Sequence, residues 1–123
     1  MKKRICVLED NEGIMEVLQF LFTDEDYQVY GFSSVGDIMK QMYSLDVDVF
    51  LLDIMLPDGS GLTVCDLLKK NKLTRFVPVV MMSAATGSAE VEKSCNADDF
   101  VTKPFDINDL VKRVSAQIDM HRL

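Results

Sequence analysis

This sequence of 123 residues has no tryptophan, and it contains only one histidine and three cysteines. The cysteines, Cys6, Cys65 and Cys95, are odd in number, widely spaced and without a C-x-x-C pair, which argues against a disulfide framework and against a structural zinc site. No histidine lies near them in the sequence, so we interpret all three as small core residues rather than nucleophiles. His121 lies two residues from the C-terminal end, and we assign it no role.

Long apolar runs and an excess of positive charge are also lacking. No run is long enough to span a bilayer, and the opening "MKKRIC" does not lead into the apolar core of a signal peptide, so we expect a soluble, cytoplasmic protein that does not bind membranes. The formal net charge of −7 disfavours direct nucleic-acid binding, which depends on clustered Lys and Arg. The length and the hydrophobic content of 48% favour one globular domain over residues 1–123.

The sequence does contain two alternating hydrophobic periods. Short runs rich in β-branched and aromatic residues predict strands over 4–9, 27–32, 48–53, 76–83 and 99–103. A weak helix is expected over 88–96, and we expect it to be the most mobile segment because it offers little apolar surface. Four other stretches have helical apolar spacing: Ile14, Val17, Leu18, Leu21; Val35, Ile38, Met39, Met42; Leu62, Cys65, Leu68; and Ile107, Leu110, Val111, Val114, Ile118.

The alternation of strand and helix, repeated five times, predicts an α/β fold. Such a (βα)5 chain forms a five-stranded parallel sheet with helices on both faces and right-handed crossovers. The runs "VFLL" and "VPVVMM" are continuously apolar, as expected for central strands buried on both faces.

Polar residues stand where the predicted strands end. They are Glu9 and Asp10, Asp53, Ser83 and Lys103. The carboxyl ends of parallel strands meet at one edge of the sheet, so these side chains should share a crevice. Three carboxylates there repel one another unless a positive charge lies among them, and Mg²⁺ suits such oxygen ligands. Lys103 and Ser83 could then hold the oxygens of a phosphoryl group.

The whole chain resembles the receiver domain, the phosphoacceptor module of bacterial two-component response regulators. The resemblance rests on "VLEDNE", "FLLDIMLPDGSGL", "PVVMMSA" and "ADDFVTKPF". It implies a doubly wound, flavodoxin-like sheet with strand order 2-1-3-4-5. It also implies a role in phosphorelay signal transduction and not as an enzyme.

The resemblance implies that Asp53 is the phosphorylated residue. Glu9, Asp10, Asp53 and the backbone carbonyl of Met55 would hold Mg²⁺, with Mn²⁺ as an alternative. Asp53 would attack a phosphoryl group carried on a histidine of a partner, either a sensor histidine kinase or a phosphotransfer protein.

The resemblance further implies how phosphorylation is read out. Ser83, Ala84 and Lys103 would bind the phosphoryl group, Ser83 and Phe100 would form a switch pair, and the bond before Pro104 would be cis. The switch would change a surface made by the fourth helix, the fifth strand and the fifth helix. That surface would contact an unknown downstream effector or a second copy in a phosphorylation-dependent dimer.

Two other functions share part of this pattern. An aspartyl-phosphate phosphohydrolase of the haloacid-dehalogenase type also uses a strand-end aspartate and magnesium, but it carries a second acid two residues later, where this chain has Met55. A flavin-binding module would need a hydroxyl- and glycine-rich phosphate loop after the first strand, whereas "EDNEGI" is acidic. Turnover of phosphate esters would reveal the first alternative, and colour would reveal the second.

The side chains near the acceptor also predict how long a phosphoryl group lasts. In receiver-like sites, the residues two past the acceptor and two past the hydroxyl residue border the path of the attacking water, and here they are Met55 and Ala85. Neither orients a water strongly by hydrogen bonding, so we expect slow self-dephosphorylation.

Overall fold

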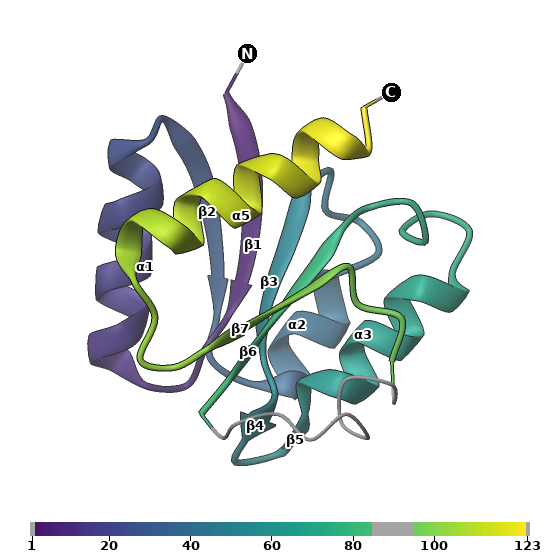
Figure 1. Cartoon of the computed structure of the whole chain (residues 1–123). Helices are drawn as coiled ribbons and strands as arrows, with labels where there is room; N and C mark the ends of the chain where they lie inside the picture. Colours follow the sequence, from purple (N-terminus) through teal and green to yellow (C-terminus); the bar gives the residue numbers. More distant parts are fainter. Residues whose placement is uncertain (1, 85–94, 123) are drawn as a thin grey trace.

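Five parallel strands form one sheet in the computed structural model, which describes residues 2–84 and 95–122 (Figure 1). The strands are β1 (Lys3–Leu8), β2 (Tyr27–Phe32), β3 (Val49–Asp53), β6 (Val79–Ser83) and β7 (Asp99–Thr102). Their order across the sheet is β2-β1-β3-β6-β7, and every neighbouring pair is parallel. Counted along the chain, this is the order 2-1-3-4-5, so the predicted flavodoxin-like sheet is confirmed.

Four helices lie within the described residues, and each begins at a side chain that caps it. They are α1 (Glu12–Asp24), α2 (Val35–Gln41), α3 (Gly61–Lys70) and α5 (Ile107–Met120). The side-chain oxygens of Asn11, Ser34, Ser60 and Asp106 accept hydrogen bonds from backbone N–H groups of the first helical turns. These caps satisfy amides that have no partner within the helix, which explains why the helices begin there. The helix expected over 88–96 lies largely outside the described residues.

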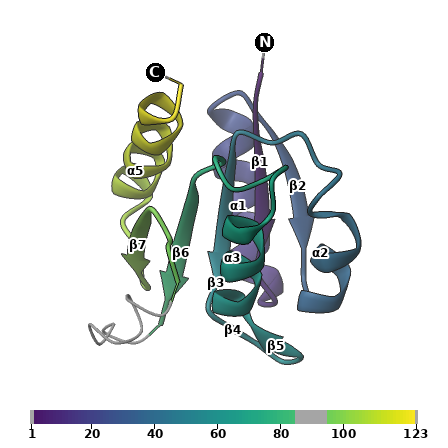
Figure 2. The same ribbon diagram turned by 90° about the vertical axis from the view of Figure 1, so that its right-hand side faces the viewer.

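The sheet separates two hydrophobic cores, as expected for a doubly wound fold. Helices α1 and α5 cover one face, and α2 and α3 cover the other (Figure 2). Consecutive residues of β1 alternate between the cores: Ile5 and Val7 pack with α1 and α5, whereas Cys6 and Leu8 pack with α2 and α3. This alternation follows from the two-residue repeat of a strand, and it explains the uninterrupted apolar runs in the sequence.

All three cysteines are buried free thiols, which confirms their interpretation as core residues. Burial raises the pKa of Cys6 to about 12. Burial, reinforced by the neighbouring Cys95 thiol, also raises the pKa of Cys65. Both groups are therefore protonated at neutral pH and are poor nucleophiles.

Three apolar residues predicted to face the core are exposed. They are Val17 in α1, Met39 in α2 and Ile107 in α5. Val17 and Met39 are each next in sequence to a buried residue of their helix, and the rotation of 100° per residue points their side chains away from the sheet. Ile107 is exposed because it is the first residue of α5. In α1 the missing core position is taken by Phe22, which is fully buried.

The fourth strand of the sheet also differs from its prediction, because β6 begins at Val79 and not at residue 76. The backbone over 71–77 instead forms hydrogen-bonded turns, and Pro78 cannot donate to a strand ladder. A short hairpin of β4 (Met55–Leu56) and β5 (Gly59–Ser60) occupies the expected turn after β3. No helix within the described residues is long and apolar enough to cross a membrane.

Candidate functional site

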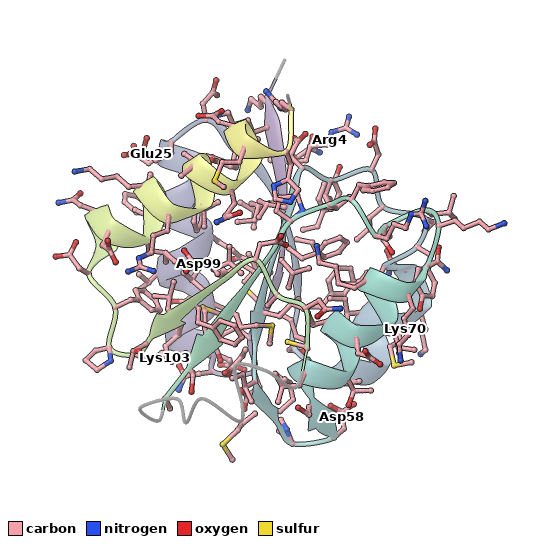
Figure 3. The ribbon with its side chains drawn as sticks, turned by 45° about the vertical axis from the view of Figure 1, so that its right-hand side comes forward. Arg4, Glu25, Asp58, Lys70, Asp99 and Lys103 are labelled. Carbon is pink, nitrogen blue, oxygen red and sulfur yellow. The ribbon has the colours of Figure 1, made fainter. Side chains whose placement is uncertain are left out.

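The carboxyl edge of the sheet brings together the acidic residues that follow β1 and end β3 with the lysine that follows β7. Lys103 lies near this edge in Figure 3, at the opposite end of the sheet from Arg4 near the start of β1. The carboxyl-bearing residues Glu9 and Asp53 are only 1% and 6% exposed. Two buried acids at one edge require compensating partners, since an unpaired buried charge is costly.

Lys103 supplies part of this compensation. Its Nζ donates hydrogen bonds to Oε1 of Glu9 and, over 3.1 Å, to Oδ2 of Asp53. The backbone N–H of Asn11 donates to the other Glu9 oxygen over 3.1 Å. Burial by itself would lower the pKa of Lys103, but the hydrogen bonds and charges of Glu9 and Asp53 outweigh it and raise that pKa above its ordinary value. Lys103 is therefore a fixed positive charge beside Asp53.

Asp10 completes a cluster of three carboxylates. Oxygen atoms of Glu9, Asp10 and Asp53 lie within 4.8 Å of one another, and Asp10 is exposed to solvent. One ammonium group cannot balance three carboxylates, so the cluster retains negative charge. Oxygen ligands at this spacing, one of them open to water, fit a hard divalent cation such as Mg²⁺, which keeps several of its waters when bound.

Replacing Lys103 with methionine is expected to lower the free energy of unfolding, measured without metal, by about 2 kcal/mol, because it leaves two buried carboxylates without their cation. Mg²⁺ should then restore more stability to this variant than to the native protein. Thermal melts with and without Mg²⁺ measure both effects. The matched control is Lys70→Met, which removes an exposed ion pair with Asp66 and should cost at most about 0.5 kcal/mol. Equal losses of stability in the two variants would contradict the role of Lys103 as the cation that compensates the buried carboxylates.

The loop after Asp53 is held by a close backbone contact that sequence reasoning missed. The N–H of Gly61 donates to the carbonyl of Ile54 over 2.8 Å, and the N–H of Ile54 donates to that of Met82 over 3.0 Å. A Cβ atom at Gly61 would lie 1.8 Å from the carbonyl oxygen of Asp53. Only glycine fits this contact, and the available signal was the second glycine of "GSG", which is the first residue of α3.

Asp58 links the hairpin to the start of α2 by hydrogen bonds that the sequence did not predict. Its two carboxylate oxygens accept hydrogen bonds from the N–H groups of Val35 (2.9 Å) and Gly36 (3.0 Å). These bonds, the one from Gly36 first, lower the pKa of Asp58 below its ordinary value. The hairpin that follows the candidate acceptor is thereby anchored to a neighbouring helix.

The remaining predicted site residues lie at the ends of β6 and β7. The N–H of Lys103 donates to the carbonyl of Ser83 over 2.7 Å, which places the end of β6 beside the lysine. Ala84 is exposed, and the Lys103–Pro104 peptide bond is cis, as the resemblance implied. Phe100 is half-buried against the core formed with α2 and α3.

Arg113 on α5 contacts the backbone of β7 next to Phe100. Its guanidinium donates to Asp99 over 3.0 Å and to the carbonyl of Phe100 over 3.3 Å, and it also pairs with Asp109. Asp99, whose position on β7 is visible in Figure 3, is the largest cause of the raised pKa of Arg113. The helical spacing of Asp109 and Arg113 indicates their pair within α5, but it does not indicate the contacts of Arg113 with β7.

An apolar groove of about 730 Å³ adjoins Lys103. Ile14 and Val17 of α1 line one side, and Pro104, Phe105 and Ile107 line the other. Val17 and Ile107, whose exposure the sequence did not predict, both line this groove.

A doubly wound sheet with an acidic pocket and a lysine at its carboxyl edge defines a flavodoxin-like α/β domain with a site at the point where the strand order reverses. The family model of the response regulator receiver domain matches residues 5–115, and the chain belongs to this family. Receiver domains act in phosphorelay signalling, interact with histidine kinases or phosphotransfer proteins, and can dimerise on activation. The match gives no support to the phosphohydrolase alternative.

Solved structures share this fold. A CheY-like receiver domain from Methanospirillum hungatei JF-1 is 22% identical, with a TM-score of 0.91 over 99% of this chain and 98% of that one. The receiver domain of Francisella response regulator 1452 is 24% identical, with a TM-score of 0.87 over 97% of this chain and 98% of that one. The beryllofluoride-activated receiver domain dimer of NtrC4 is 24% identical, with a TM-score of 0.84 over 96% of this chain and 98% of that one.

Proposed function

We propose that this chain accepts a phosphoryl group on Asp53 in a reaction that depends on Mg²⁺. The observation that carries the proposal is the placement of the Asp53 carboxylate, buried beside the ammonium group of Lys103 and within a cluster of three acids. Phosphoramidate with Mg²⁺ is the direct test, and intact-mass measurement should show a single phosphoryl adduct. A protein that gains no adduct, or several, would contradict the proposal.

The proposed reaction needs no other nucleophile from the chain. A carboxylate oxygen of Asp53 attacks phosphorus, the bond from phosphorus to the donor nitrogen breaks in line, and an acyl phosphate forms. Lys103 compensates charge on the phosphoryl oxygens. Mg²⁺, or Mn²⁺, held by Glu9, Asp10, Asp53 and the carbonyl of Met55 would neutralise further charge. We propose that the chain is a stoichiometric acceptor and not a turnover enzyme.

We further propose that the donor is a phosphohistidine on a helix of a sensor kinase or a phosphotransfer protein. The apolar groove between α1 and the segment after β7 supports this choice, because it adjoins Lys103 and so brings its occupant beside Asp53. Exposed apolar residues such as Val17 and Ile107 suit burial against a partner helix.

Phosphorylation would be read out at the far side of the pocket. Ser83 and the backbone of Ala84 would move toward the phosphoryl group, and Phe100 would turn into the space they leave. The link from Arg113 to the carbonyl of Phe100 supports a coupling of this movement to α5. We propose that β7, α5 and the fourth helix implied by the resemblance form the surface that contacts an effector or a second copy.

Exchanging Met55 and Ala85 for polar residues is expected to shorten the life of the phosphoryl group. Met55 is 76% exposed two residues beyond Asp53, and Ala85 lies outside the described residues. The double variant Met55→Asn, Ala85→Glu should orient water better and lose phosphate about tenfold faster, roughly 1.4 kcal/mol of barrier. Decay is measured after the donor is removed, with Met39→Asn, at an exposed methionine of α2, as control. Equal or slower decay of the double variant would refute the expectation.

A further inference from the structure

The segment between α3 and β6 forms an ordered turn rather than an irregular loop. The carbonyl of Asn71 accepts from the N–H groups of Thr74 (3.2 Å) and Arg75 (2.9 Å), and its side-chain Oδ1 accepts from Leu73 (2.8 Å). The buried hydroxyl of Thr74 donates to the carbonyl of Leu68 over 2.6 Å. These bonds hold the turn against the end of α3, so its outward side chains have a defined arrangement.

Two large apolar side chains point into solvent from this turn. Leu73 is 74% exposed and Phe76 is 73% exposed. Their spacing of three residues places them on one side of a helical turn, and Thr74 occupies the buried side. The Arg75 guanidinium lies 4.6 Å from the centre of the Phe76 ring. Two large apolar side chains exposed on one ordered turn therefore offer apolar surface for burial against a partner.

The same turn carries positive charge in an acidic chain. Four of the 13 basic residues fall within 69–75, which contains no acidic residue, although the formal net charge is −7. Lys69 and Lys70 are paired with Asp98 and Asp66. Among the residues that the structure describes, Lys72 and Arg75 have no carboxylate partner, and both are exposed. Lys70, labelled in Figure 3, ends α3 directly before them.

We propose that Lys72, Leu73, Arg75 and Phe76, here called the basic turn, bind an acidic peptide segment of a partner protein that carries two apolar side chains. The apolar pair would anchor the segment, and the two cations would select negative charge. A short segment contacts only the basic turn, whereas nucleic acid or an anionic membrane would also meet the excess of negative charge elsewhere on the chain. The basic turn precedes β6, so it lies at the sheet edge opposite Asp53, and this surface is distinct from the phosphorylation pocket.

Peptide selection tests this proposal without knowledge of the partner. A random library of displayed dodecapeptides is selected on the full chain after removal of peptides that bind the variant Leu73→Ser, Phe76→Ser. Recovered peptides should be rich in Asp and Glu with two apolar residues. Their affinity should fall at least about tenfold in Lys72→Glu, Arg75→Glu and should weaken with added salt. The control Met39→Ser, Lys40→Glu changes one exposed apolar and one exposed basic residue of α2 and should bind as the native chain does.

Several outcomes would overturn the proposal. They are recovery of neutral or basic peptides, equal binding to the charge-reversed variant, or no recovered peptide. Co-sedimentation of the chain with phosphatidylglycerol vesicles through the basic turn, or self-association through it in light scattering, would also assign the surface to another occupant. Every variant should still gain one adduct from phosphoramidate. Loss of that adduct would indicate a folding defect, which separates a failure of this proposal from a failure of the phosphoacceptor assignment.

Discussion

Replacement of Asp53 by asparagine is expected to abolish the phosphoryl adduct formed with phosphoramidate and Mg²⁺. An amide oxygen is a far weaker nucleophile than a carboxylate, and it cannot form an acyl phosphate. The rate should fall below about one-thousandth of the native rate, which corresponds to more than roughly 4 kcal/mol of barrier. The two side chains have nearly the same shape, so the fold should persist. Intact-mass measurement over time, with circular dichroism as a check on folding, gives the comparison.

The matched control for this experiment is Asp58→Asn. Asp58 lies five residues further along the same loop, is exposed, and holds the start of α2 instead of facing the pocket. This variant should keep a single adduct. An adduct that survives in Asp53→Asn would place the acceptor elsewhere, and a loss in both variants would point to disruption of the whole loop.

Replacement of Gly61 by alanine is expected to destabilise the protein by roughly 4 kcal/mol and to slow phosphorylation as well. The added Cβ would lie 1.8 Å from the carbonyl oxygen of Asp53 and 2.8 Å from its carbonyl carbon. Both atoms belong to the backbone, so no side-chain rotation relieves the clash. Either α3 or the acceptor strand must shift, and Asp53 moves relative to Lys103. Urea unfolding measures the first effect, and the rate of adduct formation measures the second.

Gly36→Ala is the matched control for Gly61→Ala. A Cβ at Gly36 would lie 3.5 Å from an oxygen of Asp58, an ordinary contact with a side chain. Gly36 is also within α2, where alanine has the better helix propensity, so this variant should be neutral or slightly stabilised. If both variants behave alike, the close contact at Asp53 is not the reason for glycine at position 61.

Element type was predictable because hydrophobic period reports directly on secondary structure. The short apolar run of β1 and the helical spacing in α5 each reflect burial along a regular element, and both elements are found where expected. Boundaries were less predictable. The apolar Phe76 extended the predicted strand, but it is exposed, because the backbone bonds of Asn71 form a turn that no periodicity describes.

The carboxyl-edge site was predictable for a geometric reason. Parallel strands end at one edge, so residues that terminate them, such as Glu9, Asp53 and Lys103, converge whatever the detailed packing. The contact of Lys103 with Glu9 could be identified only from the structure. The sequence indicates that a positive charge is needed among the carboxylates, but it does not indicate which carboxylate Lys103 contacts. The Gly61 contact was likewise invisible, since it joins backbone atoms and carries no side-chain pattern.

The sequence by itself determined the fold class, the strand order implied by the family resemblance, and the edge at which the charged residues meet. The fold class and the edge followed from burial periodicity and strand direction, which are local properties that propagate through short connections, whereas the strand order followed from the resemblance alone. Only the tertiary structure decided the ion pairs of Lys103, the placement of Asp58 on α2, and the exposure of Leu73 and Phe76. Each of these depends on side chains and amides brought together from elements far apart or from a turn held by its own hydrogen bonds, and no repeat in the chain encodes such contacts.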